Sequence, residues 1–312
     1  MKTKKLIPYI FGAFFLILLI GEIVLREKWG FAHAPLYYAS KDFEYMAQPN
    51  QEGYRFGNHY KYNSYAQRSD EPQKDKTIIL GLGDSVIYGG VMIDQDSIAT
   101  SIVSREIKNV QMLNISAGSW GPDNVAAYLR KYGLFGAKAM VLLVSSHDAH
   151  DNMDFKPVVG THPSYPDKQY SLAWLELFDR YLIPRYILPL FKSKEGTKNE
   201  LDPDQQVLAG VNIDKKGKVF NPGFEEVRLM ATKANIPLII LLHADQEELK
   251  EKKYNQQGQE IIKWAESHQL PLYKELDYAF QKSDYRDGIH TNAHGQRKEA
   301  NIMETAIKKF VK

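Results

Sequence analysis

The order of apolar and polar positions changes twice along this chain of 312 residues. The first feature is a run of apolar residues at 6–25, interrupted by Glu22 near its end and preceded by Lys2, Lys4 and Lys5. About 20 apolar residues are enough for a helix to cross the hydrocarbon core of a bilayer. The run therefore predicts a membrane-spanning helix, and the lysines before it favour a cytoplasmic N-terminus.

A cleaved signal peptide is the alternative interpretation of this run. A triplet of the A-x-A type occurs at Ala32 to Ala34, but it lies well beyond the apolar run and Pro35 follows it. The run is also longer than the apolar region of an ordinary signal peptide. We therefore expect residues 1–28 to be a cytoplasmic tip and an uncleaved anchor, with the remaining chain in the periplasm or on the cell surface.

Short apolar runs alternate with amphipathic stretches from residue 76 onward. The apolar runs predict strands at 77–83, 110–116, 139–146, 237–243 and 271–276. The amphipathic stretches predict helices at 97–108, 124–135, 224–235, 258–269 and 293–310. Continuous apolar strands are buried on both faces, so this alternation predicts a parallel sheet of about five strands in a three-layer α/β/α sandwich. Sites in such folds lie at the carboxyl ends of the strands.

Two segments depart from this alternation. Residues 29–75 form an aromatic N-terminal arm, in which alternating tyrosines around a turn at residues 57–58 predict a hairpin. Residues 150–222 form an insertion in the domain at 76–312 and are rich in aromatic residues and proline. The insertion is a lid over a site, a surface against the membrane, or an addition without a role in the site that has its own small apolar cluster. Its polar part at 192–206 predicts a mobile loop.

Composition excludes several classes of function. A net charge of +2, with no basic stripe between aromatic residues, argues against a nucleic-acid partner. The chain has no cysteine, which excludes disulfides, thiolate metal sites and cysteine nucleophiles. Residues 81–83 read G-x-G but are not followed by the third glycine of a dinucleotide fingerprint, so no cofactor is expected.

A serine and a histidine are both predicted at the carboxyl edge of the sheet. Ser85 stands in GLGDSVIYGG, directly after the first strand of the sheet. A neutral serine is a poor nucleophile and needs a base beside it. Asp287 and His290 stand in DGIH, in the loop between the last strand and the last helix. At this spacing the carboxylate can orient the imidazole and stabilise its protonated form.

These motifs together resemble the SGNH hydrolase superfamily, the GDSL type of esterases and lipases. The shared features are GDS after the first strand, a glycine after the second, a polar motif after the third, and D-x-x-H before the last helix. The resemblance covers residues 76–148 and 223–312. It implies acyl transfer through an acyl-serine intermediate, with Ser85 as nucleophile, His290 as general base and then acid, and Asp287 as the group that orients it.

The resemblance also implies an oxyanion site. Gly118, after the second strand, matches the glycine whose backbone N–H binds the oxyanion, and the N–H of Ser85 is a second donor. The family usually has G-x-N-D after the third strand, with the asparagine as a further donor. Here the chain reads SSHD, so His147 takes the place of that asparagine. An imidazole N–H can also donate to an oxyanion, and its charge would make activity depend on pH.

Several histidines and aspartates are also candidates for metal ligands or substrate contacts. The stretch HDAHDN, with His147, Asp148, His150 and Asp151, is dense in metal-ligand types, but no helical pattern places them on one face, so no metal is predicted. His243 ends the fourth strand at the correct edge, where it either contacts substrate or satisfies the end of the strand.

The prediction from the sequence is therefore a membrane-anchored, extracytoplasmic serine esterase. Its partner would be an acylated carbohydrate or small ester, with O-acetyl groups on a polysaccharide as the expected substrate. The first alternative is an O-acetyltransferase that uses the same three residues with a sugar hydroxyl as acceptor. The second is a non-catalytic scaffold in a polysaccharide-assembly complex, which the intact Ser85, His290 and Asp287 argue against.

Overall fold

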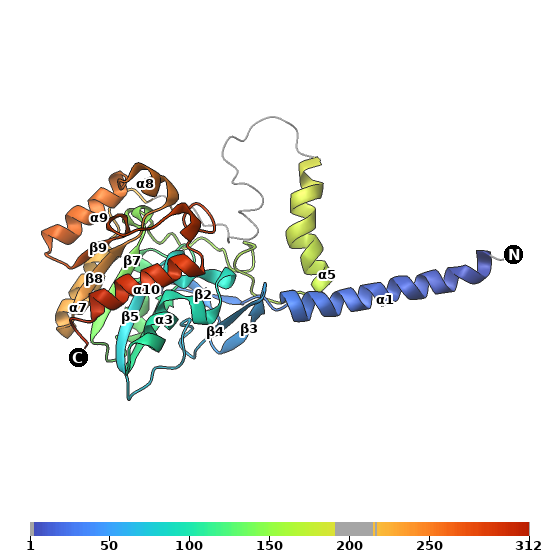
Figure 1. The fold of residues 1–312 in the computed structure, drawn as a ribbon, viewed down its shortest axis with the longest axis horizontal. Coiled ribbons are helices and arrows are strands. Elements are labelled where there is room, and N and C mark those ends of the chain that lie inside the picture. The colour runs from blue at the N-terminus through green and yellow to red at the C-terminus, as the bar shows by residue number, and fades with distance from the viewer. Residues whose placement is uncertain (1–2, 191–214, 216, 312) are drawn as a thin grey trace.

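The computed structural model describes residues 3–190, 215 and 217–311 (Figure 1). A single long helix, α1 (Thr3–Trp29), projects from one side of the molecule, and the remaining chain forms an α/β body with two small hairpins. The stretch Ile7–Trp29 is long and apolar enough to cross a membrane, with mean hydropathy 2.3, and its most apolar part is not buried against the protein. The helix predicted from the apolar run is therefore present and free of the body along most of its length.

The body is built on one five-stranded sheet. The strands lie in the order β6-β5-β7-β8-β9 and all neighbouring pairs are parallel. Their bounds are β5 (Thr77–Gly83), β6 (Val110–Ser116), β7 (Ala139–Val144), β8 (Leu238–Leu242) and β9 (Leu272–Lys274). Gly83, the last residue of β5, pairs with Ser116 of β6 and Leu143 of β7. The three central strands therefore end together, and the loops that follow them share one edge.

Helices cover both faces of this sheet. Alternate residues of each strand point to opposite faces: Ile79 packs with α3 (Ala99–Glu106) and α10 (Ala293–Ile307), whereas Leu80 packs with the helices of the other layer. That other layer comprises α4 (Pro122–Tyr132), α7 (Gly223–Ala234) and α9 (Gln256–Ser267). Because each strand is buried on both sides, its apolar run is continuous. The predicted three-layer α/β/α sandwich is confirmed.

Short helices occupy several loops of the body. After β5 come α2 (Ser85–Tyr88), η1 (Gly90–Met92) and η2 (Gln95–Ser97). After β7 comes η3 (Ser146–Ala149), and after β8 comes α8 (Gln246–Glu251). Two further single turns, η6 (Glu275–Asp277) and η7 (Lys282–Asp284), precede the last helix. The sequence pattern did not predict α8. The helix expected at 124–135 ends earlier, at Tyr132, because Gly133 adopts φ 80° and terminates it.

The N-terminal arm forms two antiparallel hairpins. Strands β1 (Tyr37–Ser40) and β2 (Glu44–Ala47) pair with each other, and β3 (Gln51–Arg55) pairs with β4 (Asn58–Tyr62) around the expected turn at residues 57–58. The first hairpin was not predicted. Phe43 and Tyr45 are buried in the same apolar core as α4, so the arm packs onto the body.

Within the described residues of the insertion, a helical segment runs across the axis of α1 (Figure 1). It begins as α5 (Ala173–Glu176), continues as the π-helical stretch η4 (Leu177–Ile187) and ends in the turn η5 (Leu188–Leu190). The loop predicted at 192–206 lies outside the described residues.

Candidate active site

The nucleophile candidate Ser85 stands on a tight turn at the end of β5. Gly83 adopts φ 155°, and a Cβ there would lie 2.3 Å from the carbonyl oxygen of Leu143 on the neighbouring strand. Asp84 then caps α2, because its Oδ1 accepts a hydrogen bond from the N–H of Val86 at 2.8 Å. The chain thus passes from strand to helix within two residues, and Ser85 is held at the carboxyl edge of the sheet.

His290 reaches Ser85 from the loop before α10. Its Nε2 lies 2.9 Å from Ser85 Oγ, and its Nδ1 lies 2.9 Å from Asp287 Oδ2. Asp287 Oδ1 also accepts hydrogen bonds from the backbone N–H groups of Ile289 at 3.0 Å and His290 at 2.7 Å. Nδ1 must donate to the carboxylate, so in the neutral ring Nε2 is the acceptor for the serine hydroxyl.

The charges around this loop favour a neutral, basic His290. Burial lowers the pKa of His290 below its ordinary value, and the Arg286 guanidinium adds to this, although the hydrogen bond that His290 donates to Asp287 opposes both. Burial alone would raise the pKa of Asp287, but its hydrogen bonds with His290 and the backbone outweigh burial and hold it well below its usual range. The carboxyl is therefore ionised and the imidazole is ready to accept a proton at neutral pH.

Arg286, which the sequence reasoning did not single out, links the DGIH loop to the turn at the end of α2. Its Nη1 donates to the carbonyl oxygen of Gly89 at 2.9 Å, and its Nε lies 3.7 Å from Asp287 Oδ2. Burial lowers the pKa of Arg286 to about 10, which leaves it charged at neutral pH. Its place next to Asp287 in the DGIH motif is the only sequence signal that could have indicated this role.

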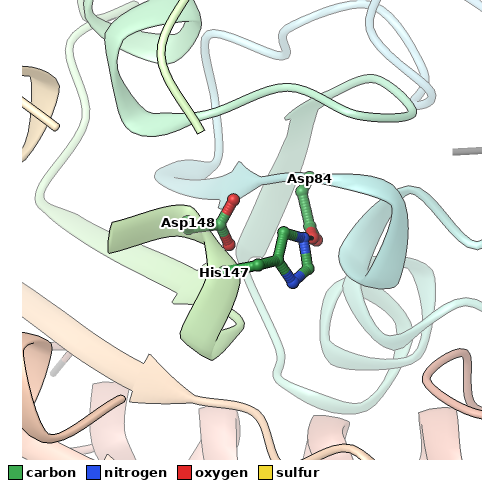
Figure 2. Close-up of side chains that lie close together, drawn as sticks. All are labelled: Asp84, His147 and Asp148. Carbon is green, nitrogen blue, oxygen red and sulfur yellow. Dashed lines mark ion pairs between the residues drawn. The ribbon is translucent and has the colours of Figure 1, made fainter. Parts of the chain in front are cut away.

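His147 follows β7, the strand that neighbours β5 on the side away from β6. Its Nε2 lies 3.5 Å from Asp84 Oδ2 and 3.8 Å from Asp151 Oδ2, and its side chain is 34% exposed. Figure 2 shows the imidazole beside the carboxylate of Asp84, with Asp148 on the other side of it. Since Asp84 directly precedes Ser85, the contact brings His147 to the nucleophile turn.

The charge state of this cluster follows from its burial. Burial alone would lower the pKa of His147, but the carboxylates of Asp148 and Asp84, with a smaller contribution from Asp151, raise it to about 10. Burial raises the pKa of Asp148 well above its usual range, and the charge of Asp84 adds to this, whereas the charge of His147 opposes both. The cluster is therefore best described as an imidazolium paired with the carboxylate of Asp84.

Two groups of side chains among the described residues have the composition of a metal site. Donor atoms of Asp84, His147 and Asp148 lie within 4.8 Å of one another, and so do those of His243, Glu275 and Glu299. In the first group, a metal ion would have to displace the proton from the imidazole of His147, because metal ligands bind in their deprotonated form.

Of the two roles left open for His243, its position supports the one that satisfies the end of the strand. Its side chain is fully buried, its Nδ1 lies 2.6 Å from Glu275 Oε2, and its Nε2 lies 2.7 Å from the carbonyl oxygen of Ile289. Burial alone would lower the pKa of His243, but the Glu275 carboxylate raises it to about 10. His243 thus satisfies the end of its strand and holds the chain just before His290.

A second set of contacts fixes the loop that carries Asp287. Gln246 donates its side-chain N–H to the carbonyl oxygen of Asp287 at 2.9 Å, and its backbone N–H to that of Gly288 at 2.9 Å. The Tyr285 hydroxyl donates to the carbonyl oxygen of Ala244 at 2.6 Å. The segment after β8 therefore supports the DGIH loop, a contact that sequence spacing could not reveal.

Gly118 lies just beyond the end of β6 and is enclosed by the arm and the insertion. Its carbonyl oxygen accepts hydrogen bonds from the hydroxyls of Tyr45, on β2, and Tyr165, in the insertion, each at 2.9 Å. A Cβ at this position would lie 2.9 Å from the Tyr165 hydroxyl oxygen, so the close approach requires glycine. Two segments outside the sheet thus fix the peptide at Gly118.

Two of the histidines given structural roles have partners elsewhere. His150 Nε2 lies 2.8 Å from Glu260 Oε2, which ties the start of the insertion to α9. His294 is the second residue of α10, and its Nδ1 lies 2.5 Å from Asp284 Oδ1. Neither contact reaches Ser85.

Comparisons with known proteins return structures but no sequence relatives. No family model matches the chain, and no curated protein matches it. A lipase/acylhydrolase from Enterococcus faecalis is 13% identical, with TM-score 0.43 over 76% of this chain and 97% of its own. A putative lipolytic protein of the G-D-S-L family from Desulfitobacterium hafniense is 9% identical, with TM-score 0.41 over 74% of this chain and 99% of its own.

A third solved structure, of the acetyl xylan esterase AlAXEase, is 15% identical to this chain. Its TM-score is 0.44, over 74% of this chain and 99% of its own. Chemistry at this site follows from the contacts of Ser85, His290 and Asp287 described above. This chain is similar, over 74–76% of its length, to structures of a lipase/acylhydrolase, a putative lipolytic protein of the G-D-S-L family and an acetyl xylan esterase.

Proposed function

We propose that residues 76–312 form a serine esterase of the SGNH type, held outside the cytoplasm by α1. The observation that carries this proposal is the continuous chain of hydrogen bonds from Ser85 Oγ through His290 to Asp287. A buried serine at 8% exposure, beside a neutral imidazole that an ionised carboxylate orients, has the geometry that nucleophilic catalysis requires.

The reaction begins when Ser85 Oγ attacks an ester carbonyl and its proton passes to His290 Nε2. The imidazolium so formed is stabilised by Asp287, whose carboxylate stays ionised. The tetrahedral intermediate collapses as His290 returns the proton to the leaving alcohol, which leaves an acyl group on Ser85. Water, activated by the same imidazole, then hydrolyses the acyl-serine and restores the free hydroxyl.

The negative oxygen of the intermediate is held by donors from three loops at one edge. These are the backbone N–H groups of Ser85 and Gly118 and the imidazolium of His147. The order β6-β5-β7 supports this grouping, because each donor follows one of three neighbouring strands. Donors of this kind typically contribute about 3–4 kcal/mol each to the transition state.

The substrate class follows from location and surroundings. An anchored domain outside the cytoplasm meets envelope or surface carbohydrate, so an O-acetylated polysaccharide is the proposed substrate. The enclosure of Gly118 by Tyr45 and Tyr165 favours a second candidate, an O-acetyltransferase, because a walled site can exclude water in favour of a sugar hydroxyl.

The test is acetate release from an acetyl-ester reporter by the full chain in detergent, with and without an oligosaccharide acceptor. Hydrolysis without acceptor, lost by about 10³-fold or more in Ser85→Ala, is the result expected of an esterase. Acetyl transfer that requires the acceptor would assign the transferase. Failure of Ser85 to react with a fluorophosphonate, together with no turnover in either assay, would leave only the scaffold alternative.

A further inference from the structure

The helical segment 173–190 of the insertion, comprising α5, η4 and η5, carries large apolar side chains that the described part of the protein does not cover. They are exposed by between 43% and 79%: Leu175, Phe178, Tyr186, Ile187, Leu188 and Leu190. They lie near the two ends of the segment, and because Leu177–Ile187 is π-helical, the three- and four-residue spacing of an α-helix does not place them on one face. A group of exposed apolar side chains of this kind marks an interaction surface.

The start of this segment is fixed to the arm. Glu176 is fully buried, and its Oε1 lies 2.5 Å from Nη2 of Arg55, which is itself 2% exposed. Glu176 Oε2 accepts a hydrogen bond from the N–H of Ala32 at 2.5 Å. A buried ion pair with a backbone bond is costly to break, so the start of the segment is held in place and is not hinged as a lid requires.

The segment begins directly against α1. The Glu22 carboxylate accepts hydrogen bonds from the N–H groups of Ala173 at 2.8 Å and Trp174 at 3.2 Å, and the Trp174 Nε1 donates to the carbonyl oxygen of Leu18 at 2.9 Å. A Cβ on Gly21 would lie 2.3 Å from the Trp174 ring, so the two helices touch where α1 has no side chain. The depth of Glu22 in a membrane therefore sets the depth at which the segment starts.

That depth is the outer boundary of the hydrocarbon. At a rise of about 1.5 Å per residue, Glu22 lies about 26 Å along α1 from Lys5, close to the ~30 Å thickness of a bilayer core. Glu22 pairs with Arg26 at 2.6 Å, and Arg26 donates to the carbonyl oxygen of Ser171 at 2.7 Å. Charged residues thus flank the apolar run at both ends, and the segment contacts α1 at the end nearer the body.

The direction and composition of the segment fit an interfacial position. Figure 1 shows it running across the axis of α1, at the junction with the body, so that it lies along a membrane plane when α1 crosses that membrane. Trp174 and Tyr186 are of the types that concentrate at membrane interfaces. A helix that lies in this position buries its apolar side chains about 5–10 Å into the headgroup boundary.

We propose that the helical segment 173–190 lies in the outer interface of the lipid bilayer, as a second membrane contact that fixes how the catalytic body faces the membrane. The inference rests on the proposed anchoring by α1. It selects the membrane role for this part of the insertion over the role of a lid.

The absence of cysteine makes depth measurement direct. The full chain is reconstituted in phosphatidylcholine vesicles containing phosphatidylglycerol, with one cysteine at a time carrying an environment-sensitive fluorophore. Leu175→Cys and Ile187→Cys report on the segment, and Phe14→Cys reports on α1. Leu229→Cys, at a position on α7 that is also 51% exposed, is the matched control.

Nitroxide lipids labelled near the headgroup should quench the probes at residues 175 and 187 severalfold more than the probe at residue 229, and deep nitroxides should quench the probe at residue 14. Quenching at residue 14 with probes at 175 and 187 as exposed to water as that at 229 would overturn the inference and leave the anchor intact. No lipid quenching at residue 14 would overturn the anchor, and the inference with it. A response at 175 or 187 to acylation of Ser85, without lipid quenching, would assign a lid instead. Retained ester hydrolysis shows that each labelled variant is folded.

Discussion

Replacing His147 with asparagine should remove a pH-dependent part of both the stability and the activity of the protein. The nearby carboxylates raise the pKa of His147 from 6.5 to about 10. A group whose pKa is raised on folding contributes stability that is present in full below its unfolded pKa and is lost as pH rises through its folded pKa. The contribution of His147 is therefore complete below about pH 6.5, declines between pH 6.5 and 10, and is absent above that range.

The magnitude can be bounded in two ways. A shift from 6.5 to about 10 corresponds to a ceiling of about 5 kcal/mol, which must be discounted because the side chain is 34% exposed to solvent. Coulomb's law for the 3.5 Å contact between His147 Nε2 and Asp84 Oδ2 gives about 1 kcal/mol in water and about 5 kcal/mol at an effective dielectric constant of 20. We expect about 2 kcal/mol.

The assay is urea unfolding of the parent chain and His147→Asn, in detergent, at several values between pH 6 and pH 10.5. The stability difference should be about 2 kcal/mol larger at pH 6 than at pH 10.5, after the pH-independent part is subtracted. The kcat for an acetyl ester at pH 8 should fall about tenfold, because a charged donor exceeds a neutral one by roughly 1–1.5 kcal/mol. A stability difference that is constant across this range would refute the assignment of an imidazolium to His147.

Three further changes test other contacts of the site. Asp287→Asn should lower kcat on the order of 10³–10⁴-fold and move the acid limb of the pH–rate profile to lower pH, because the carboxylate that supports protonation of His290 is lost; an unchanged limb would argue against the pairing. Tyr165→Phe removes one of the two hydroxyls that donate hydrogen bonds to the carbonyl oxygen of Gly118, and should lower kcat by about tenfold with KM little changed. A rise in KM alone would instead place that tyrosine in substrate binding. Glu275→Gln leaves the buried imidazole of His243 without its charge partner, and should cost about 3–5 kcal/mol of unfolding free energy at pH 7; a loss below about 1 kcal/mol in denaturant melts would show that the pair is not ionised.

The fold was accessible from the sequence because each strand is buried on both faces. The runs at 77–83 and 110–116 are β5 and β6 residue for residue. Alternation of such runs with amphipathic stretches leaves few arrangements other than a parallel sheet between two helical layers. The first hairpin escaped prediction because its strands have only four residues each and their burial follows packing on the body, which no local pattern records.

The candidate triad was also accessible, because its members stand in short motifs at the ends of predicted elements. Ser85 directly follows a strand, and Asp287 and His290 directly precede a helix. Parallel strands bring such loops to one edge whatever lies between them. Other contacts of the loop were not accessible. Arg286 contacts Gly89 across 197 residues, and Gln246 contacts Asp287 across 41 residues, and the direction of these side chains is not encoded by motif spacing.

His243 and His147 show where the boundary falls. Both end or follow a strand at the correct edge, so their positions relative to the predicted strands are alike. In the tertiary structure, His243 is buried under the DGIH loop with Glu275, whereas His147 is partly exposed beside the nucleophile turn. Burial and charge partners, not residue type, set what each imidazole can do.

By itself the sequence determined the membrane-length helix, the parallel sheet and the three residues that meet at its edge, because hydrophobic periodicity and chain order are local properties. The tertiary structure alone decided the rest: the enclosure of Gly118 by Tyr45 and Tyr165, the charge of His147, and the contact of the insertion with α1 at Glu22. These features arise from atoms far apart in the chain, and their energies depend on burial and distance, which exist only once the chain has folded.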